Sequence, residues 1–175
     1  MASEVAQSAD RPRLGVGLAL LVGVVLAVAG FVLLGYLLAL TPLYAGFLFL
    51  WYWASVAKVD FKALPGILIG ALAGTATAWL LQYCDRIYGL TGLYLMLTLI
   101  TLAVLVQIMN WAPIAINTPY MLFLTVTAAP LLQGGEDFRA VLAVILVGAI
   151  YFALFVYLGR RIFLLLLDRR ALAES

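Results

Sequence analysis

The chain carries no charged residue between Arg13 and Lys58, and this long uncharged stretch is almost wholly apolar. The rest of the sequence follows the same pattern: 67% of all residues are hydrophobic and only 10% are charged. Soluble domains carry about 25% charged residues. Because so apolar a chain has too little polar surface to face water, the sequence predicts an integral membrane protein.

Short polar or Pro-containing stretches divide the chain into six apolar segments. They cover residues 14–40, 42–57, 61–83, 88–112, 119–132 and 138–158. Lipid offers no partners for backbone N–H and C=O groups, and the segments do not alternate as barrel strands do, so each is predicted to be an α-helix. The IFLLLL stretch after Arg161 is too short to cross, and we predict a helical continuation or an interfacial segment there.

Positive residues are distributed unevenly along this six-span arrangement. One face of the membrane receives Arg11, Arg13, Lys58, Lys62, Arg160, Arg161, Arg169 and Arg170, and the other receives Arg86 and Arg139. Since positive residues near span ends stay cytoplasmic, both termini are predicted to be cytoplasmic. Residues 1–13 then form a polar tail, and residues 162–175 form a second cytoplasmic or interfacial tail.

The two halves of the chain match each other at an offset of 77 residues. Thr41-Pro42 aligns with Thr118-Pro119, and Asp60-Phe61 aligns with Asp137-Phe138. Thr followed by Pro favours the start of a helix, because Thr can cap it and Pro lacks an N–H that would have no partner there. Asp favours the same position for the third and sixth helices. The match predicts an internal duplication.

Residues 14–83 and 84–161 are therefore predicted to be two three-helix repeats. Each repeat holds an odd number of spans, so the second must be inverted relative to the first, a plan that places transporter sites between the repeats. The second and fifth helices are predicted to be short, since about 15 residues reach only ~22 Å against a ~30 Å hydrocarbon core. Short, Pro-marked helices at matching positions are typical of a transport site.

The two Thr-Pro starts are the best candidates for that site. A helix N-terminus presents unpaired N–H groups and about half a positive charge, so two of them facing one cavity would hold an anion without a buried Lys or Arg. The alternative is that both helices begin at the membrane surface. The candidate substrate-binding residues are Thr41, Pro42, Tyr44, Trp51, Gln107, Asn117, Thr118, Pro119 and Tyr120.

Several of these candidates also have structural explanations. Trp51 fits an interfacial aromatic belt as well as a wall against an organic substrate. Tyr44 and Tyr120 can donate to a carboxylate or simply pack. The amides of Gln107 and Asn117 can line a cavity or bridge helices.

The third segment contains small and hydroxyl residues that predict close packing. Gly66, Gly70 and Gly74 recur at every fourth position, which allows close contact between helices inside the chain or at a homodimer interface. Thr75 and Thr77 follow, and we expect them to hydrogen-bond to their own helix backbone.

The composition excludes several kinds of site. There is no His, so catalysis by imidazole and His-based metal sites are ruled out in this chain. The single Cys84 cannot form an internal disulfide or a multi-Cys metal site and is predicted to be a small apolar filler. We predict no metal or cofactor, no enzymatic activity and no nucleic-acid partner.

Two stretches carry a family resemblance. The first, PLYAGFLFLWYWASVAKVDFKALPGILIGALAGTATAWLL, joins an aromatic-Trp-Ala segment to a basic-flanked helix rich in Gly and Ala. It resembles the first half of the fusaric-acid-resistance and aromatic-acid-exporter superfamily. The second, TPYMLFLTVTAAPLLQGGEDFRAVLAVILVGAIYFALFVYLGRR, is similar to the closing portion of small bacterial inner-membrane relatives. Together the resemblance covers residues 14–161.

The resemblance implies a six-helix domain of the bacterial inner membrane that exports organic acids, often aromatic carboxylates. The chain lacks the cytoplasmic domain and second membrane unit of the larger exporters, which favours a homodimer or a partner such as a periplasmic adaptor. We therefore expect a transporter or channel for small organic anions. The alternatives are a pathway for a small neutral solute and a non-transporting membrane scaffold subunit.

Overall fold

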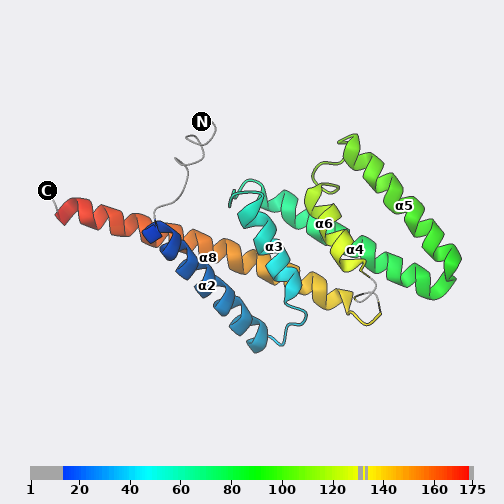
Figure 1. The fold of residues 1–175 in the computed structure, drawn as a ribbon, viewed down its shortest axis with the longest axis horizontal. Helices are drawn as coiled ribbons and strands as arrows, with labels where there is room; N and C mark the ends of the chain where they lie inside the picture. The colour runs from blue at the N-terminus through cyan, green and yellow to red at the C-terminus, as the bar shows by residue number, and fades with distance from the viewer. Residues whose placement is uncertain (1–13, 130–131, 133, 174–175) are drawn as a thin grey trace.

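The computed structural model of the chain describes residues 14–129, 132 and 134–173. The predicted N-terminal tail, residues 1–13, lies outside the described residues. The described residues form helices and contain no strand (Figure 1). In chain order the helices are α2 (Leu14–Leu37), α3 (Tyr44–Ser55), α4 (Leu64–Tyr88), α5 (Leu90–Ile108), α6 (Thr118–Thr127) and α8 (Phe138–Ala173).

Helix length divides these elements into two groups. α2, α4, α5 and α8 each contain a stretch that is long and apolar enough to cross a membrane. α3 and α6 have only 12 and 10 residues, which corresponds to about 18 Å and about 15 Å. For the described residues, the prediction of an all-helical fold with a short second and fifth helix is confirmed, and the four long apolar helices have the character of an integral membrane protein.

The last helix is longer than the predicted span of residues 138–158. α8 has 36 residues and continues without a break to Ala173. The predicted helical continuation of the tail is therefore present as far as Ala173.

The predicted capping role of Thr in the Thr-Pro starts is wrong for both short helices. α6 begins at Thr118, and the residue before it, Asn117, is the N-cap: its Oδ1 accepts from the backbone N–H of Tyr120 at 3.1 Å. Asn has the geometry to cap, and its extended backbone (φ −135°, ψ −175°) suits that position. α3 begins at Tyr44, and its N-cap position, Leu43, makes no side-chain cap.

The two aspartates form the same local turn at positions that the 77-residue offset aligns. Asp60 Oδ1 accepts from the backbone N–H of Lys62 at 2.9 Å, and Asp137 Oδ1 accepts from that of Arg139 at 3.0 Å. Asp137 directly precedes α8 and caps it, as predicted. Asp60 lies in the turn before α4, whose N-cap position is Ala63 without a side-chain cap, so the prediction is wrong for this helix.

The short helices pack on long helices from the other half of the chain. α6 lies along α4, and α3 lies along α8. α4 also contacts α5 and α8, and α2 contacts α8 (Figure 1). The centre of the fold is therefore the pair of long helices α4 and α8, each of which carries one short helix.

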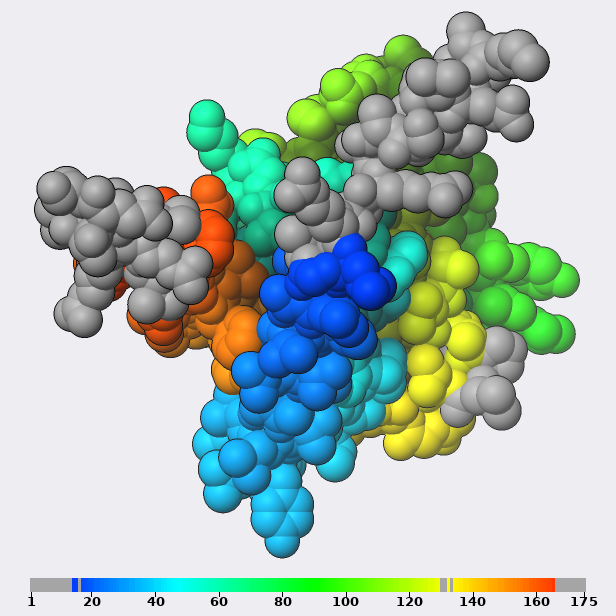
Figure 2. Space-filling view, turned by 60° about the vertical axis from the view of Figure 1, so that its left-hand side comes forward, coloured from blue at the N-terminus to red at the C-terminus, as the bar shows by residue number. Residues whose placement is uncertain are grey.

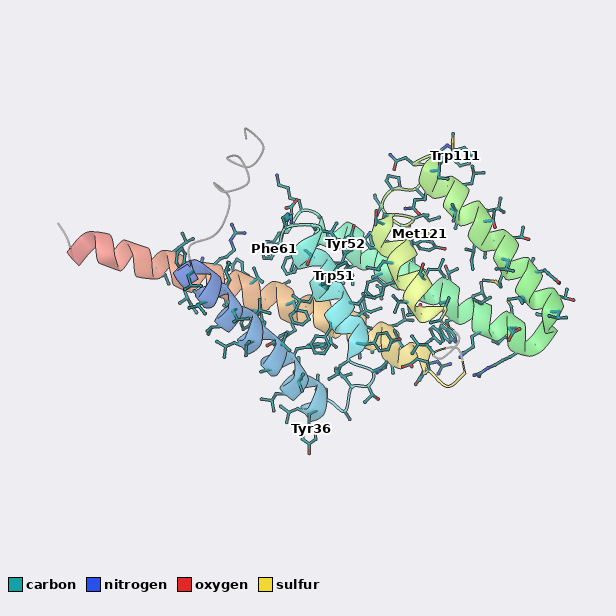
Figure 3. All side chains as sticks on the ribbon, in the orientation of Figure 1. Tyr36, Trp51, Tyr52, Phe61, Trp111 and Met121 are labelled. Carbon is teal, nitrogen blue, oxygen red and sulfur yellow. The ribbon has the colours of Figure 1, made fainter. Side chains whose placement is uncertain are left out.

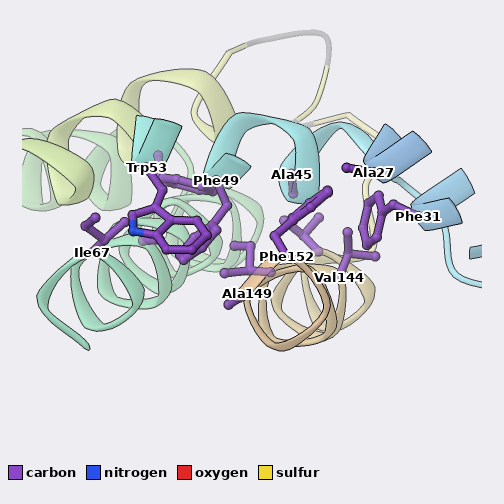
Figure 4. Close-up of a cluster of buried hydrophobic side chains, with 13 residues drawn as sticks. Ala27, Phe31, Ala45, Phe49, Trp53, Ile67, Val144, Ala149 and Phe152 are labelled. Carbon is purple, nitrogen blue, oxygen red and sulfur yellow. The ribbon is translucent and has the colours of Figure 1, made fainter. Parts of the chain in front are cut away.

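The main hydrophobic core lies where α3 packs on α8 (Figure 4). Phe49 and Trp53 of α3, Phe31 of α2 and Phe152 of α8 are all fully buried there. The rings of Phe31 and Phe152 have centroids 4.8 Å apart. The indole Nε1 of Trp53 donates to the backbone oxygen of Asp60 at 3.0 Å, so the turn before α4 is fastened to this core.

Most apolar side chains of the two outer helices, α2 and α5, are exposed. Exposed apolar faces of this size suit contact with lipid or with another protein. Figure 3 shows Tyr36, at the end of α2, and Trp111, after α5, projecting from opposite edges of the molecule. Aromatic residues at both edges are typical of the two membrane interfaces.

Candidate functional site

The structure does not bring the two Thr-Pro starts together. Figure 1 shows α3 beginning at the lower edge of the helical body, after the end of α2, and α6 beginning at the upper edge, after the end of α5. Thr41 and Thr118 are both exposed, Pro42 is half-buried and Pro119 is buried. The two helix starts thus lie at different edges and do not face each other.

Asn117 is held by bonds within the protein. Its Nδ2 lies 2.9 Å from the backbone oxygen of Gly66, and 3.2 Å and 3.1 Å from those of Pro113 and Ile114. Its Oδ1 caps α6 through Tyr120 N–H. Both polar atoms of the side chain therefore have protein partners, and the amide bridges helices, which is the structural role that the sequence left open.

Tyr120 is also engaged with the protein. Its side chain is 4% exposed, and its hydroxyl lies 3.1 Å from Oγ1 of Thr77 on α4. Thr77 Oγ1 donates to the backbone oxygen of Ala73 at 2.9 Å, so the Tyr120 hydroxyl donates to Thr77. Thr77 thus bonds to its own helix as predicted and accepts from α6 as well.

The glycines of α4 make room for α6. A Cβ on Gly70 would meet the side chain of Asn117, and a Cβ on Gly74 would meet the backbone oxygen of Tyr120. A Cβ on Gly66 would meet nothing within 4 Å. Of the two uses predicted for this Gly spacing, contact within the chain is confirmed for Gly70 and Gly74.

Tyr44 differs from these residues because its polar atom has no partner in the described part of the chain. Its hydroxyl is buried and makes no hydrogen bond, although the side chain packs against the main core. The carboxylate of Glu136, before α8, is close enough to act on it electrostatically. A buried polar group normally has a partner, so such a hydroxyl is a candidate for contact with water or a ligand.

Thr75 on α4 is a second buried hydroxyl of this kind. It is fully buried, and its Oγ1 has no hydrogen-bond partner among the described residues. The expectation that Thr75 bonds to its own helix backbone is therefore wrong, although it holds for Thr77. The difference could not be read from the sequence because both residues are Thr on one helix.

The remaining candidates, Trp51 and Gln107, lie on different elements. Trp51 is 54% exposed on α3, and Figure 3 shows it with Tyr52 near Phe61 at the α3–α4 turn. Gln107 is half-buried near the end of α5. The exposure of Trp51 agrees with an interfacial position better than with a wall inside the protein.

One hollow is a groove that the sequence did not indicate. A groove of about 760 Å³ lies between α2, α3 and α8 and is lined almost wholly by apolar groups. A smaller one of about 330 Å³ lies on α4 beside Ala76, Trp79, Leu80 and Tyr83. On α2 the larger groove is lined by small residues at every fourth position, a spacing that the sequence contains at Gly15, Ala19, Gly23 and Ala27.

Two arginines lie over aromatic rings at the ends of the long helices. The guanidinium carbon of Arg160 is 6.0 Å from the ring centroid of Phe61, and that of Arg139 is 5.8 Å from the ring centroid of Trp79. The first contact joins α8 to the α3–α4 turn, and the second joins the start of α8 to α4. Contacts of this kind contribute about 0.5–1 kcal/mol at exposed sites.

Comparison with protein-family models, with curated proteins and with solved structures found no match for this chain.

Proposed function

We propose that the chain is a membrane transporter or channel for small organic anions, with aromatic or aliphatic carboxylates as the substrate class. In this proposal its six helices form two inverted three-helix halves in the bacterial inner membrane, and the substrate interacts with groups between the halves. A homodimer is the proposed assembly, and a periplasmic adaptor is a further candidate partner.

The helix contacts support the proposed relation between the two halves. A twofold operation that exchanges α2 with α5, α3 with α6 and α4 with α8 converts the α3–α8 contact into the α6–α4 contact. It also converts the α2–α8 contact into the α5–α4 contact and returns the α4–α8 contact to itself. The matching turns at Asp60 and Asp137 obey the same operation.

The charges support one orientation of the unit. Lys58 and Lys62 lie in the turn that Arg160 reaches through Phe61. Arg139 lies against α4 through Trp79, toward the end of α4 where Arg86 is found. The more positive side of a membrane protein stays in the cytoplasm. We therefore propose that this side, and with it both termini of the chain, faces the cytoplasm.

The single observation that carries the substrate class is the buried Tyr44 hydroxyl, which has no hydrogen-bond partner among the residues that the structure describes. A phenol O–H is a neutral donor, and hydrogen bonds from donors to a carboxylate are about twice as strong as those between neutral groups. Tyr44 can thus hold an anion at the start of α3, within a stretch, residues 14–57, that contains no Lys or Arg. The nearby Glu136 carboxylate opposes a second negative charge beside Tyr44.

The test is flux in liposomes that contain the purified chain. Uptake of radiolabelled benzoate should be faster than in protein-free liposomes, and Tyr44→Phe should lower it by about tenfold, the effect of one hydrogen bond to a charged group. The matched control is Tyr120→Phe. It removes a hydroxyl that is already hydrogen-bonded to Thr77, so flux should stay near the wild-type value. Equal flux in the wild type and Tyr44→Phe would contradict the role of Tyr44.

A scaffold subunit is the second candidate function. At the start of α6 the side chains of Asn117 and Tyr120 are hydrogen-bonded to α4, and both residues pack against its glycines, so they are not free to bind a substrate. Absence of flux for both benzoate and a panel of aliphatic acids would favour it. Flux of benzamide as fast as that of benzoate would instead favour the neutral-solute pathway.

A further inference from the structure

The apolar groove between α2, α3 and α8 has the dimensions of one lipid chain. On α2 its lining runs from Gly15 to Ala27, which is about 18 Å along a helix. On α8 it runs from Phe152 to Phe163, which is about 16 Å. Half of a ~30 Å hydrocarbon core is ~15 Å, so the groove extends through about one leaflet. Figure 2 shows its two walls, α2 in blue beside α8 in orange.

One end of this groove is positively charged. Gly159 and Phe163 line it there, and Arg160 and Arg161 lie between them on α8. Val59 lines the groove from the α3–α4 turn, next to Lys58.

Aromatic rings connect the charged end to the groove wall. Arg160 lies over the ring of Phe61, Phe61 meets Trp53 edge-on with centroids 5.2 Å apart, and Trp53 lines the groove. Asp60 is the acidic residue in the same turn, and its Oδ1 accepts from the N–H of Lys62. The charge at this end is therefore positive in sum.

We propose that this groove binds one anionic phospholipid, with an acyl chain along α2 and the phosphate beside Arg160 and Arg161. An anionic phospholipid has the same layout as the site: an apolar chain about one leaflet long that ends in a negative headgroup. Basic residues at the cytoplasmic ends of membrane helices attract such lipids. A helix from a second copy of the chain would fill the apolar part but would have no use for the charged end.

The experiment measures lipid binding to the full chain in detergent by native mass spectrometry. Phosphatidylglycerol and phosphatidylcholine with identical acyl chains are compared, and phosphatidylglycerol should bind about tenfold more tightly or better, given two nearby arginines. The double variant Arg160→Gln/Arg161→Gln should lose this preference while phosphatidylcholine binding stays unchanged. Its matched control is Arg86→Gln/Arg139→Gln, which removes two charges at the other end and should keep the preference.

A second pair of variants tests the groove itself. Gly23 lines the groove, and a Cβ there meets nothing within 4 Å. The side chain of Gly23→Leu therefore starts in open space, occupies part of the groove and should weaken binding of both lipids. Gly17 is equally open but does not line the groove, and Gly17→Leu should bind lipid like the wild type. Both changes replace Gly by Leu on α2, so helix propensity changes alike in the two variants.

Three results would overturn the proposal. They are equal binding of the two lipids by the wild type, an unchanged preference in Arg160→Gln/Arg161→Gln, and wild-type binding by Gly23→Leu. Loss of a dimer in Gly23→Leu with lipid binding intact would assign the groove to a second copy of the chain. None of these results depends on whether the protein transports anions, so the two proposals fail separately.

Discussion

The side-chain nitrogen of Asn117 lies 2.9 Å from the backbone oxygen of Gly66 and fastens the start of α6 to the first turn of α4. The two residues are 51 positions apart and belong to different halves of the chain. Because the same side chain caps α6 through Tyr120 N–H, one residue both caps the N-terminus of a helix and joins two helices.

Asn117→Ala should destabilise the protein by about 1–3 kcal/mol, since it removes a helix cap and leaves the Gly66 oxygen without this donor. Thermal unfolding in detergent, followed by circular dichroism, measures the change. Asn117→Ser separates the two roles, because Ser can still cap α6 but is too short to reach Gly66. The loss of stability in Asn117→Ser should therefore be about half of that in Asn117→Ala. A wild-type melting temperature for Asn117→Ala would show that neither bond matters.

Gly74→Ala should be more damaging than Gly66→Ala, although both place one methyl group on the same helix. At Gly74 the new Cβ would press on the backbone of Tyr120, and overpacking of this kind costs about 1–3 kcal/mol. At Gly66 the space is open, and the better helix propensity of Ala should make the change neutral or stabilising by up to ~1 kcal/mol. The reverse order of stabilities would mean that α6 does not lie on this face.

The hydroxyls of Tyr120 and Thr77 should be energetically coupled. In a double-mutant cycle with Tyr120→Phe and Thr77→Val, we expect a coupling energy of about 0.6 kcal/mol, the average for hydrogen bonds between membrane helices. The cycle is measured by unfolding in mixed micelles. Additive effects of the two changes would contradict the contact.

Much of the fold can be predicted from the sequence because apolar runs, Pro and charged residues set the helix limits. The second and fifth helices were predicted to be short from the spacing of their flanking residues, and α3 and α6 are short. The N-caps were harder to predict. At α6 both Asn117 and Thr118 are good caps, and only the backbone path decides between them.

The site was less predictable because its features depend on contacts between distant elements. Tyr44 and Tyr120 occupy similar sequence contexts, yet one hydroxyl has no partner among the described residues and the other meets Thr77. That difference depends on which helix lies opposite. The small-residue spacing on α2 was visible, but nothing local to it indicates that α8 forms the other wall of a groove.

Labelling with a membrane-impermeant maleimide should place Lys58 and Arg86 on opposite sides of the membrane. In a Cys84→Ala background, Lys58→Cys should react only when the cytoplasmic face is open to the reagent, and Arg86→Cys should react from outside in spheroplasts. Both side chains are exposed in the structure. If the reagent fails to label one of the cysteines, the membrane and not burial in the protein should be the cause. Labelling of the two positions from the same side would contradict the six-span arrangement.

Anion selectivity is the central claim, and competition for uptake tests it most directly. Liposomes containing the wild-type chain are loaded with labelled benzoate in the presence of excess unlabelled benzoate or excess benzamide, which has the same ring and no charge. The proposal predicts uptake well above that of protein-free liposomes, inhibited by benzoate and unaffected by benzamide. Uptake equal to that of protein-free liposomes, or equal inhibition by both competitors, would contradict it.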